Sequence, residues 1–166
     1  MEEYIDLFLN FISENESWAP PLIGLMAFLE SIFLIGLIMP ATVIMVATGA
    51  LIGAEALELL PITIAASIGC FLGDNVSYYV GRKVRPGLVK TELFRKHRNI
   101  ILRSHLLFRK YGIYAVFLGR FLGPLRSTVP TVAGVLRVPI IKFQIANFCS
   151  AIIWPPLYML PGIVII

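Results

Sequence analysis

The feature that most constrains this chain is a pair of arginines inside an apolar run. Between residues 113 and 136 the only charged side chains are those of Arg120 and Arg126. A guanidinium keeps its proton, so it must meet an anion, carbonyl oxygens or water. An arginine at the centre of a bilayer costs about 3 kcal/mol or more. The run therefore predicts a functional element, because a simple membrane anchor would avoid these charges.

The composition predicts an integral membrane protein. Hydrophobic residues make up 58% of the chain, and the mean hydropathy of +0.84 lies outside the range of ordinary soluble domains. We expect an all-α polytopic helical bundle, and 166 residues suffice for a single domain. Cys70 and Cys149 lie in apolar segments without ligand spacing, so we expect no metal, cofactor or disulfide.

A basic block indicates which part of the chain faces the cytoplasm. Ten of the 14 lysines and arginines lie between residues 82 and 110. Beside membrane segments such a block follows the positive-inside rule, which places it in the cytoplasm. Nucleic-acid binding is disfavoured because no aromatic stacking pattern accompanies the charge. The block is predicted to be an amphipathic linker, either a solvated helix or one that binds lipid headgroups.

Hydropathy divides the chain into six predicted segments. They are an amphipathic helix (1–16), a first re-entrant hairpin (18–53), a transmembrane helix (61–81), the basic cytoplasmic linker (82–110), a second re-entrant hairpin (111–137) and a transmembrane helix (139–166). The first hairpin run is much longer than the about 20 residues that one crossing needs. Gly36 and Pro40 in its middle favour an interruption, although a single crossing stays open as an alternative.

The flanking charges suggest that the two hairpins enter the membrane from opposite sides. Lys110 precedes the second hairpin and Arg137 follows it, whereas acidic residues flank the first. Two hairpin-plus-helix units in opposite orientations form an inverted repeat, which is a transporter architecture. A weak local likeness supports it, since Gly49-Ala50-Leu51 and Gly134-Val135-Leu136 occupy similar places in the two units.

Four ionisable residues inside the apolar segments form the candidate site: Glu30, Asp74, Arg120 and Arg126. One interpretation is that two acids and two arginines only compensate each other. The glycines and prolines near the arginines favour an anion site, because loosened backbone exposes N–H donors beside the guanidinium groups. A phosphate fits best. Both arginines reach one ligand only if the chain bends at Gly123-Pro124, and Pro40 and Pro130 mark further predicted interruptions.

The acids have two predicted roles, and catalysis is not expected. Glu30 is predicted to exchange a proton during transport, whereas for Asp74 a packing role and a coupling role stay open. Both histidines, His97 and His105, lie in the basic segment, and no hydrolase motif occurs. Ser127 lacks a base that would make it a nucleophile. We therefore expect an anion to be bound and moved without chemistry.

Three ordered motifs cover nearly the whole chain and resemble one family. They are Phe28-Leu29-Glu30 leading to Pro40, Gly69-x-x-x-Gly73-Asp74 leading to Tyr78 and Gly81-Arg82, and Gly119-Arg120-Phe121 leading to Arg126, Pro130 and Ala133-Gly134. They resemble the DedA family, also called the SNARE-associated or VTT domain family. Trp154-Pro155-Pro156 and Leu160-Pro161-Gly162 are similar to its YabI-like branch.

This resemblance implies two opposed re-entrant hairpins and a role in moving lipids across the bacterial inner membrane. It implies recycling of undecaprenyl phosphate, coupling to the proton-motive force, and support of the envelope, with Glu30, Arg120 and Arg126 on functional positions. Two departures stand out: Pro40-Ala41-Thr42 lacks the second acid of many members, and Gly123-Pro124 reverses the usual order. Members are commonly longer, so an end at Ile166 suggests a fragment or a truncated member.

The functional hypothesis is a transporter or flippase for a phosphate-headed lipid, such as a polyprenyl phosphate or a phospholipid. Its expected partners are membrane lipids, and a homo-oligomer stays open. The first alternative is a proton-coupled or sodium-coupled transporter of a soluble ion, in which the arginines only compensate the acids. The second is a membrane scaffold that acts through the basic segment 82–110.

Overall fold

The computed structural model describes residues 11–12, 15–32, 41–83 and 98–165, and in these residues the regular structure is entirely helical. In chain order the elements are η1 (Glu16–Trp18), α2 (Ala19–Ser31), α3 (Ala41–Gly53), α4 (Leu59–Lys83), α6 (Arg98–Tyr111), α7 (Tyr114–Gly119), η3 (Gly123–Leu125), α8 (Thr128–Val135) and α9 (Ile140–Ile165). The predictions for residues 1–10, for Gly36 and Pro40, and for most of the basic linker lie outside the described residues. The all-α prediction is confirmed for the described part.

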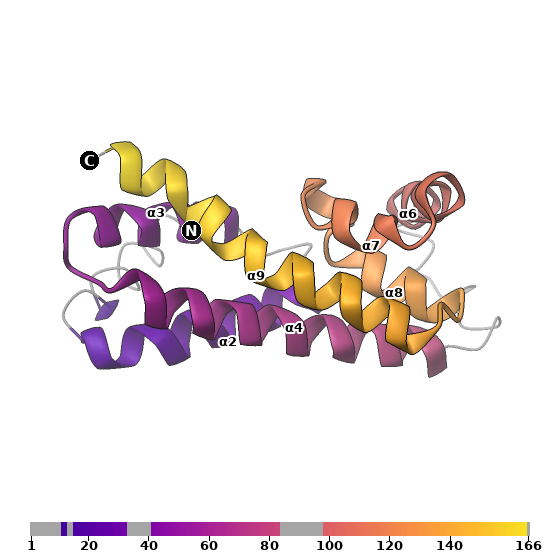
Figure 1. Ribbon diagram of the computed structural model, residues 1–166, viewed down its shortest axis with the longest axis horizontal. Coiled ribbons are helices and arrows are strands. Elements are labelled where there is room, and N and C mark those ends of the chain that lie inside the picture. Colours follow the sequence, from indigo (N-terminus) through magenta and orange to yellow (C-terminus); the bar gives the residue numbers. More distant parts are fainter. Residues whose placement is uncertain (1–10, 13–14, 33–40, 84–97, 166) are drawn as a thin grey trace.

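Two long helices, α4 and α9, form the axis of the molecule (Figure 1). Both are long and apolar enough to cross a membrane, with mean hydropathies of 1.5 and 1.7. The predicted crossing 61–81 lies within α4, and most of the predicted crossing 139–166 lies in α9. Helix α9 continues through Pro155, Pro156 and Pro161.

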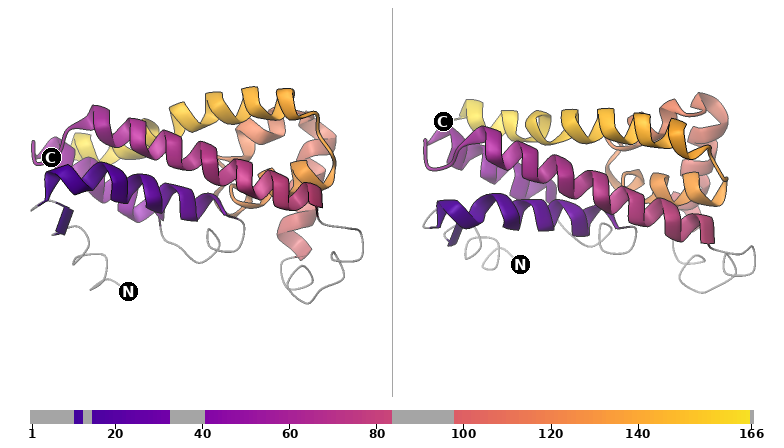
Figure 2. Two further views of the ribbon diagram at one scale, coloured as in Figure 1. Left: turned by 90° about the horizontal axis from the view of Figure 1, so that it is seen from below. Right: turned by 60° about the horizontal axis from the view of Figure 1, so that its bottom comes forward.

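The shorter helices pack at the two ends of this axis. Figure 2 shows α9, α4 and α2 side by side, with α4 in the middle. Helix α3 packs on the C-terminal half of α9, whereas α8 packs on the C-terminal half of α4 and α7 on α9. Two apolar clusters fill the interior, one around Ile23, Met45 and Trp154, the other around Tyr78 and Phe143.

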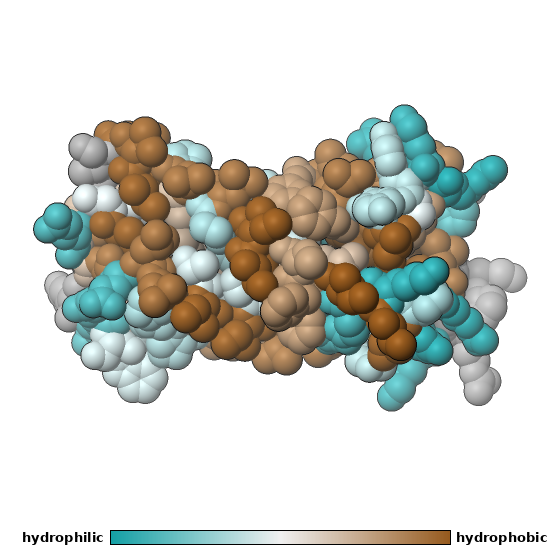
Figure 3. Space-filling model, viewed as in Figure 1, coloured by the Kyte–Doolittle hydropathy of each residue, from teal (hydrophilic) through white to brown (hydrophobic). Residues whose placement is uncertain are grey.

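The outer surface of α4 and α9 is largely apolar, as contact with lipid requires. Many large apolar side chains of α4 and α9 are exposed, Ile68 and Ile145 among them. Hydrophobic residues cross the middle of the face in Figure 3, and hydrophilic residues gather toward both ends. Apolar side chains turned outward in this way would be unfavourable in water and are favourable against lipid.

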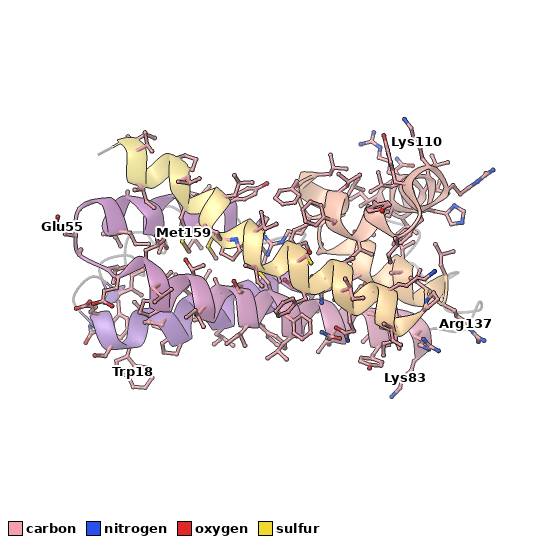
Figure 4. The ribbon with its side chains drawn as sticks, in the orientation of Figure 1. Trp18, Glu55, Lys83, Lys110, Arg137 and Met159 are labelled. Carbon is pink, nitrogen blue, oxygen red and sulfur yellow. The ribbon has the colours of Figure 1, made fainter. Side chains whose placement is uncertain are left out.

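Helices α2 and α3 form one pair, and α7 and α8 form another. Each pair begins and ends at the same end of the molecule (Figure 4). Trp18 before α2 and Glu55 after α3 lie at one end. Lys110, near the start of the α7–α8 pair, and Arg137 after it lie at the other end, together with Lys83. The α2/α3 pair and the α7/α8 pair therefore lie with their outer termini at opposite ends of the molecule. Re-entry into a bilayer and the inverted repeat stay predictions, because no membrane is present.

Small residues allow α2 to approach α4 closely. A Cβ atom added to Gly69 would overlap the carbonyl oxygen of Gly24, and one added to Gly73 would overlap that of Phe28. The Gly69-x-x-x-Gly73 spacing thus places backbone against backbone, as small residues do in membrane bundles. Ser77, one turn later, donates a hydrogen bond to the Ser31 carbonyl at 2.9 Å.

Two further close crossings have the same register. Where α3 crosses α9, Gly49 faces the Met159 carbonyl and Gly162 faces that of Val46. Where α8 crosses α4, Gly134 faces the Tyr78 carbonyl and Gly81 faces that of Thr131. In each crossing the contacted carbonyl lies three residues before the glycine of its own helix. The short helices α3 and α8 therefore meet the long helices α9 and α4, respectively, in the same way.

These crossings predict that β-branched residues are not tolerated there. Gly81→Val and Gly162→Val should each lower the free energy of unfolding by about 1–3 kcal/mol, because a new side chain must displace backbone. Thermal unfolding in detergent measures the effect. The control is Val80→Ile, whose side chain is 53% exposed on α4 and should leave the melting temperature unchanged. Equal stability of all three variants would contradict tight packing at the crossings.

Candidate functional site

The four charged residues singled out from the sequence come together inside the bundle. Exposure is 6% for Glu30 on α2, 2% for Asp74 on α4, 3% for Arg120 and 6% for Arg126. Arg120 directly follows α7, and Arg126 directly follows η3. Burial of this depth is costly for a charge unless it is paired or hydrogen-bonded.

The backbone between the arginines is broken, which brings both side chains to α4. Helix α7 ends at Gly119, and Gly123 has a φ of +48°, a conformation that favours glycine. Arg120 forms an ion pair with Asp74, and Arg126 Nη2 donates to Cys70 Sγ at 3.3 Å. Because Cys70 and Asp74 are four residues apart, the two guanidinium groups reach successive turns of one helix face.

Arg126 lies between α2 and α9. Its Nη1 is 2.6 Å from Glu30 Oε1, and its guanidinium carbon is 3.5 Å from the centre of the Trp154 ring. A guanidinium stacked this closely on an indole face gains a cation–π attraction. The carboxylate and the aromatic face together compensate for the water that Arg126 has lost.

Arg120 is held by α4 and α9 through an amide network. Besides its ion pair, Arg120 Nη2 donates to Asn147 Oδ1 at 3.0 Å, and Asn147 Nδ2 donates to the Phe71 carbonyl at 3.2 Å. Asn75 donates to the same carbonyl at 2.7 Å and accepts a bond from Gln144. Asn147 therefore fixes where Arg120 lies relative to α4.

The pairing leaves hydrogen-bonding groups unused. Several buried side-chain atoms lack a hydrogen-bond partner among the described residues, namely Glu30 Oε2, Asp74 Oδ1, Arg120 Nη1, Arg126 Nε and Trp154 Nε1. A buried polar atom without a partner costs about 1–3 kcal/mol. Each ion pair thus has spare donors and acceptors for water or for another polar ligand.

Some site residues were missed by the sequence interpretation. Asn147, Trp154 and Cys70 were not proposed as site residues. A signal existed, because Gln144, Asn147, Ser150 and Trp154 recur every three or four residues on one face of α9. Of the predicted backbone positions, Pro130 lies in the first turn of α8, where proline is tolerated, and Pro124 belongs to η3.

The described residues contain no cluster of three or more histidine, cysteine or acidic side chains that would hold a metal ion. The site therefore consists of two arginine–carboxylate pairs, an amide network and one indole ring. Two apolar helices of membrane-spanning length, with such charge pairs buried among α2, α4 and α9, are features of a helical membrane protein.

Comparison with known proteins identifies the family. The model of the VTT domain matches residues 39–164. The chain therefore belongs to the VTT domain family, the DedA family that the sequence motifs resembled.

Similar proteins include named bacterial membrane proteins. The chain is 36% identical to the inner membrane protein YabI of Escherichia coli K12, over 95% of this chain and 62% of that protein. It is 34% identical to the uncharacterized membrane protein BU139 of Buchnera aphidicola from Acyrthosiphon pisum, over 93% and 60%. It is 33% identical to the E. coli inner membrane protein YqjA, over 76% and 58%. The chain spans about three fifths of these relatives, and no solved structure matches it.

The ion pairs predict strong coupling between their members. Glu30→Gln alone should lower the free energy of unfolding by about 3–5 kcal/mol, because Arg126 is left buried without its counter-charge. The double variant Glu30→Gln/Arg126→Met should cost clearly less than the sum of the two single changes. A double-mutant cycle of unfolding in detergent measures this. The control is Glu58→Gln, an exposed residue directly before α4. Additive losses for the pair would contradict the coupling.

Proposed function

We propose that this protein moves a phosphate-headed lipid, such as a polyprenyl phosphate or a phospholipid, across the bacterial inner membrane. The observation that carries the proposal is the pair of buried guanidinium groups beside an interrupted backbone, each with an N–H group that has no hydrogen-bond partner among the described residues. A phosphate accepts several hydrogen bonds at once and matches the planar fork of arginine.

In this proposal the carboxylates hold the site while it is empty. A phosphate that approaches Arg126 competes with Glu30 for the same guanidinium, 2.6 Å away in the pair. A buried carboxylate that loses its cation is costly as an anion, so Glu30 takes up a proton. Arrival and departure of the lipid are thereby linked to the proton-motive force. Asp74 plays the corresponding part for Arg120, or keeps that side chain in place.

The transport cycle alternates access to this site. All four charged side chains are buried, so a lipid headgroup reaches them only after helices separate. The matching α3–α9 and α4–α8 crossings support an inverted repeat in which one unit rocks against the other. We place the end that carries Lys83, Lys110 and Arg137 in the cytoplasm, because basic residues favour that side.

A second candidate is transport of a soluble ion coupled to protons or sodium. It is favoured by the finding that each arginine pairs with an acid, as expected if the arginines only compensate charge. Losing both members of a pair should then be tolerated. In the lipid-phosphate proposal the double loss removes a phosphate ligand, so transport stays impaired.

The first experiment measures lipid movement in reconstituted liposomes. A labelled polyprenyl phosphate should move between leaflets, and Arg126→Ala should abolish movement because the ligand for the phosphate is lost. Arg120→Lys should slow it at least tenfold, because a point charge replaces a bidentate fork. The controls are Arg137→Lys, away from the buried pairs, and a labelled polyprenol without phosphate.

Three outcomes would contradict this proposal. Full transport by Arg120→Lys would exclude bidentate binding of the phosphate by Arg120. Restored transport in Glu30→Gln/Arg126→Gln would reduce Arg126 to a counter-charge and favour the soluble-ion alternative. Movement of the polyprenol at the same rate as the polyprenyl phosphate would show that the protein does not recognise the phosphate. Melting temperatures of the variants separate loss of transport from loss of folding.

A further inference from the structure

A groove that is separate from the buried ion pairs lies at the end of the molecule that carries Lys83, Lys110 and Arg137. It has a volume of about 420 Å³ and lies between α6 and the turn that joins α8 to α9. Its lining combines three basic side chains with an apolar wall, and the residues are His105, Phe108, Arg109, Gly112, Ile113, Leu136, Val138, Pro139 and Lys142. This groove does not include the buried arginines.

The groove is bounded by two ordered turns. On one side, Gly112 ends α6 with a φ of +56°, and its N–H donates to the Phe108 carbonyl at 2.8 Å. On the other side, the N–H of Arg137 donates to Gly134 and that of Val138 to Ala133, both at 3.0 Å. This bonding closes α8 as a Schellman motif.

A buried tyrosine holds the second turn in place. The Tyr78 hydroxyl on α4 donates to the Val138 carbonyl at 2.6 Å, and Arg82 donates to that hydroxyl at 2.8 Å. The Tyr78 ring also stacks on Phe143 of α9, with the ring centres 4.3 Å apart. The groove is therefore formed before any ligand arrives, which lowers the cost of binding.

The position of the groove matches the headgroup layer of a bilayer. Figures 1 and 2 show α6 running across the end of the bundle, crosswise to α4 and α9. If α4 and α9 cross the membrane, α6 lies along its surface. Leu102 and Leu106 of α6 are exposed beside its basic residues, as in helices that rest in the interface.

The charge of the groove selects an anion. His105 and Arg109 come from α6 and Lys142 from α9, and no carboxylate of the described residues lines the groove. The described acids lie elsewhere: Glu16, Glu55 and Glu58 belong to the opposite end, and Glu30 and Asp74 to the buried pairs. Cations above an apolar wall complement a phosphate that carries acyl chains.

We propose that this groove binds an anionic phospholipid of the adjacent leaflet, with the lipid phosphate at Arg109 and Lys142 and the start of the acyl chains along Ile113 and Leu136. The site is distinct from the buried arginines and does not require transport. A resident lipid here joins α6 to the start of α9, two elements that flank the second hairpin. It thereby fixes the hairpin end against the membrane surface.

The test measures binding to the purified full chain in a zwitterionic detergent. Short-chain phosphatidylglycerol is titrated against phosphatidylcholine with the same chains, and binding is followed by the rise in melting temperature. The wild type should bind phosphatidylglycerol at least tenfold more tightly. Arg109→Gln/Lys142→Gln should bind phosphatidylglycerol about tenfold more weakly than the wild type does. The control Lys83→Gln/Arg103→Gln removes the same charge from the same end outside the groove and should keep the wild-type affinity.

Each other outcome overturns the proposal. Equal loss in both double variants would show general attraction to a basic surface. Equal binding of the two lipids by the wild type would show that no anion site exists. Protection by inorganic phosphate equal to that by phosphatidylglycerol would make the groove a site for free phosphate. Because this test depends on Arg109 and Lys142, whereas the transport test depends on Arg120 and Arg126, failure here and failure of the transport proposal are distinguishable.

Discussion

The rest of the structure depends on the need to compensate two guanidinium groups inside an apolar bundle. An arginine cannot neutralise itself by losing its proton, so its burial forces other elements to supply partners. Glu30 comes from α2, Asp74 from α4, and Asn147 and Trp154 from α9. The segment from α7 to α8 is thereby tied to α2, α4 and α9, and the ion pairs specify how these elements fit together.

The ion pairs can form because the helix backbones approach one another closely. Arg120 and Arg126 meet their partners only because the helices are near one another, and glycines allow that distance at Gly69 and Gly73 and at the two matched crossings. In a membrane, apolar side chains gain little by leaving lipid for protein, so packing and polar contacts must hold helices together. The small residues and the buried charges therefore both hold the helices together. The small residues do so by allowing close packing, and the charges do so by electrostatic attraction.

Membership of the VTT domain family and the buried pairs bear on function at different levels. The family establishes a membrane protein related to named inner membrane proteins. The pairs support our proposal of a phosphate ligand, because guanidinium groups with N–H groups that lack a partner are suited to a multivalent anion. The groove between α6 and the turn that joins α8 to α9 is separate from these pairs, and its basic and apolar lining supports our proposal of a bound phospholipid.

The sequence by itself determined the membrane class, the helical fold of the described residues, the two long helices and the four charged residues that lie in apolar segments. These follow from hydropathy and from the cost of charge in an apolar run, which are local properties. Only the tertiary structure decided that Arg120 pairs with Asp74 and Arg126 with Glu30, and that Asn147, Trp154 and Cys70 complete their surroundings. Two acids and two arginines allow more than one pairing, and the choice depends on which helix faces meet. Those faces are set by glycine contacts between segments far apart in the chain, which no local pattern encodes.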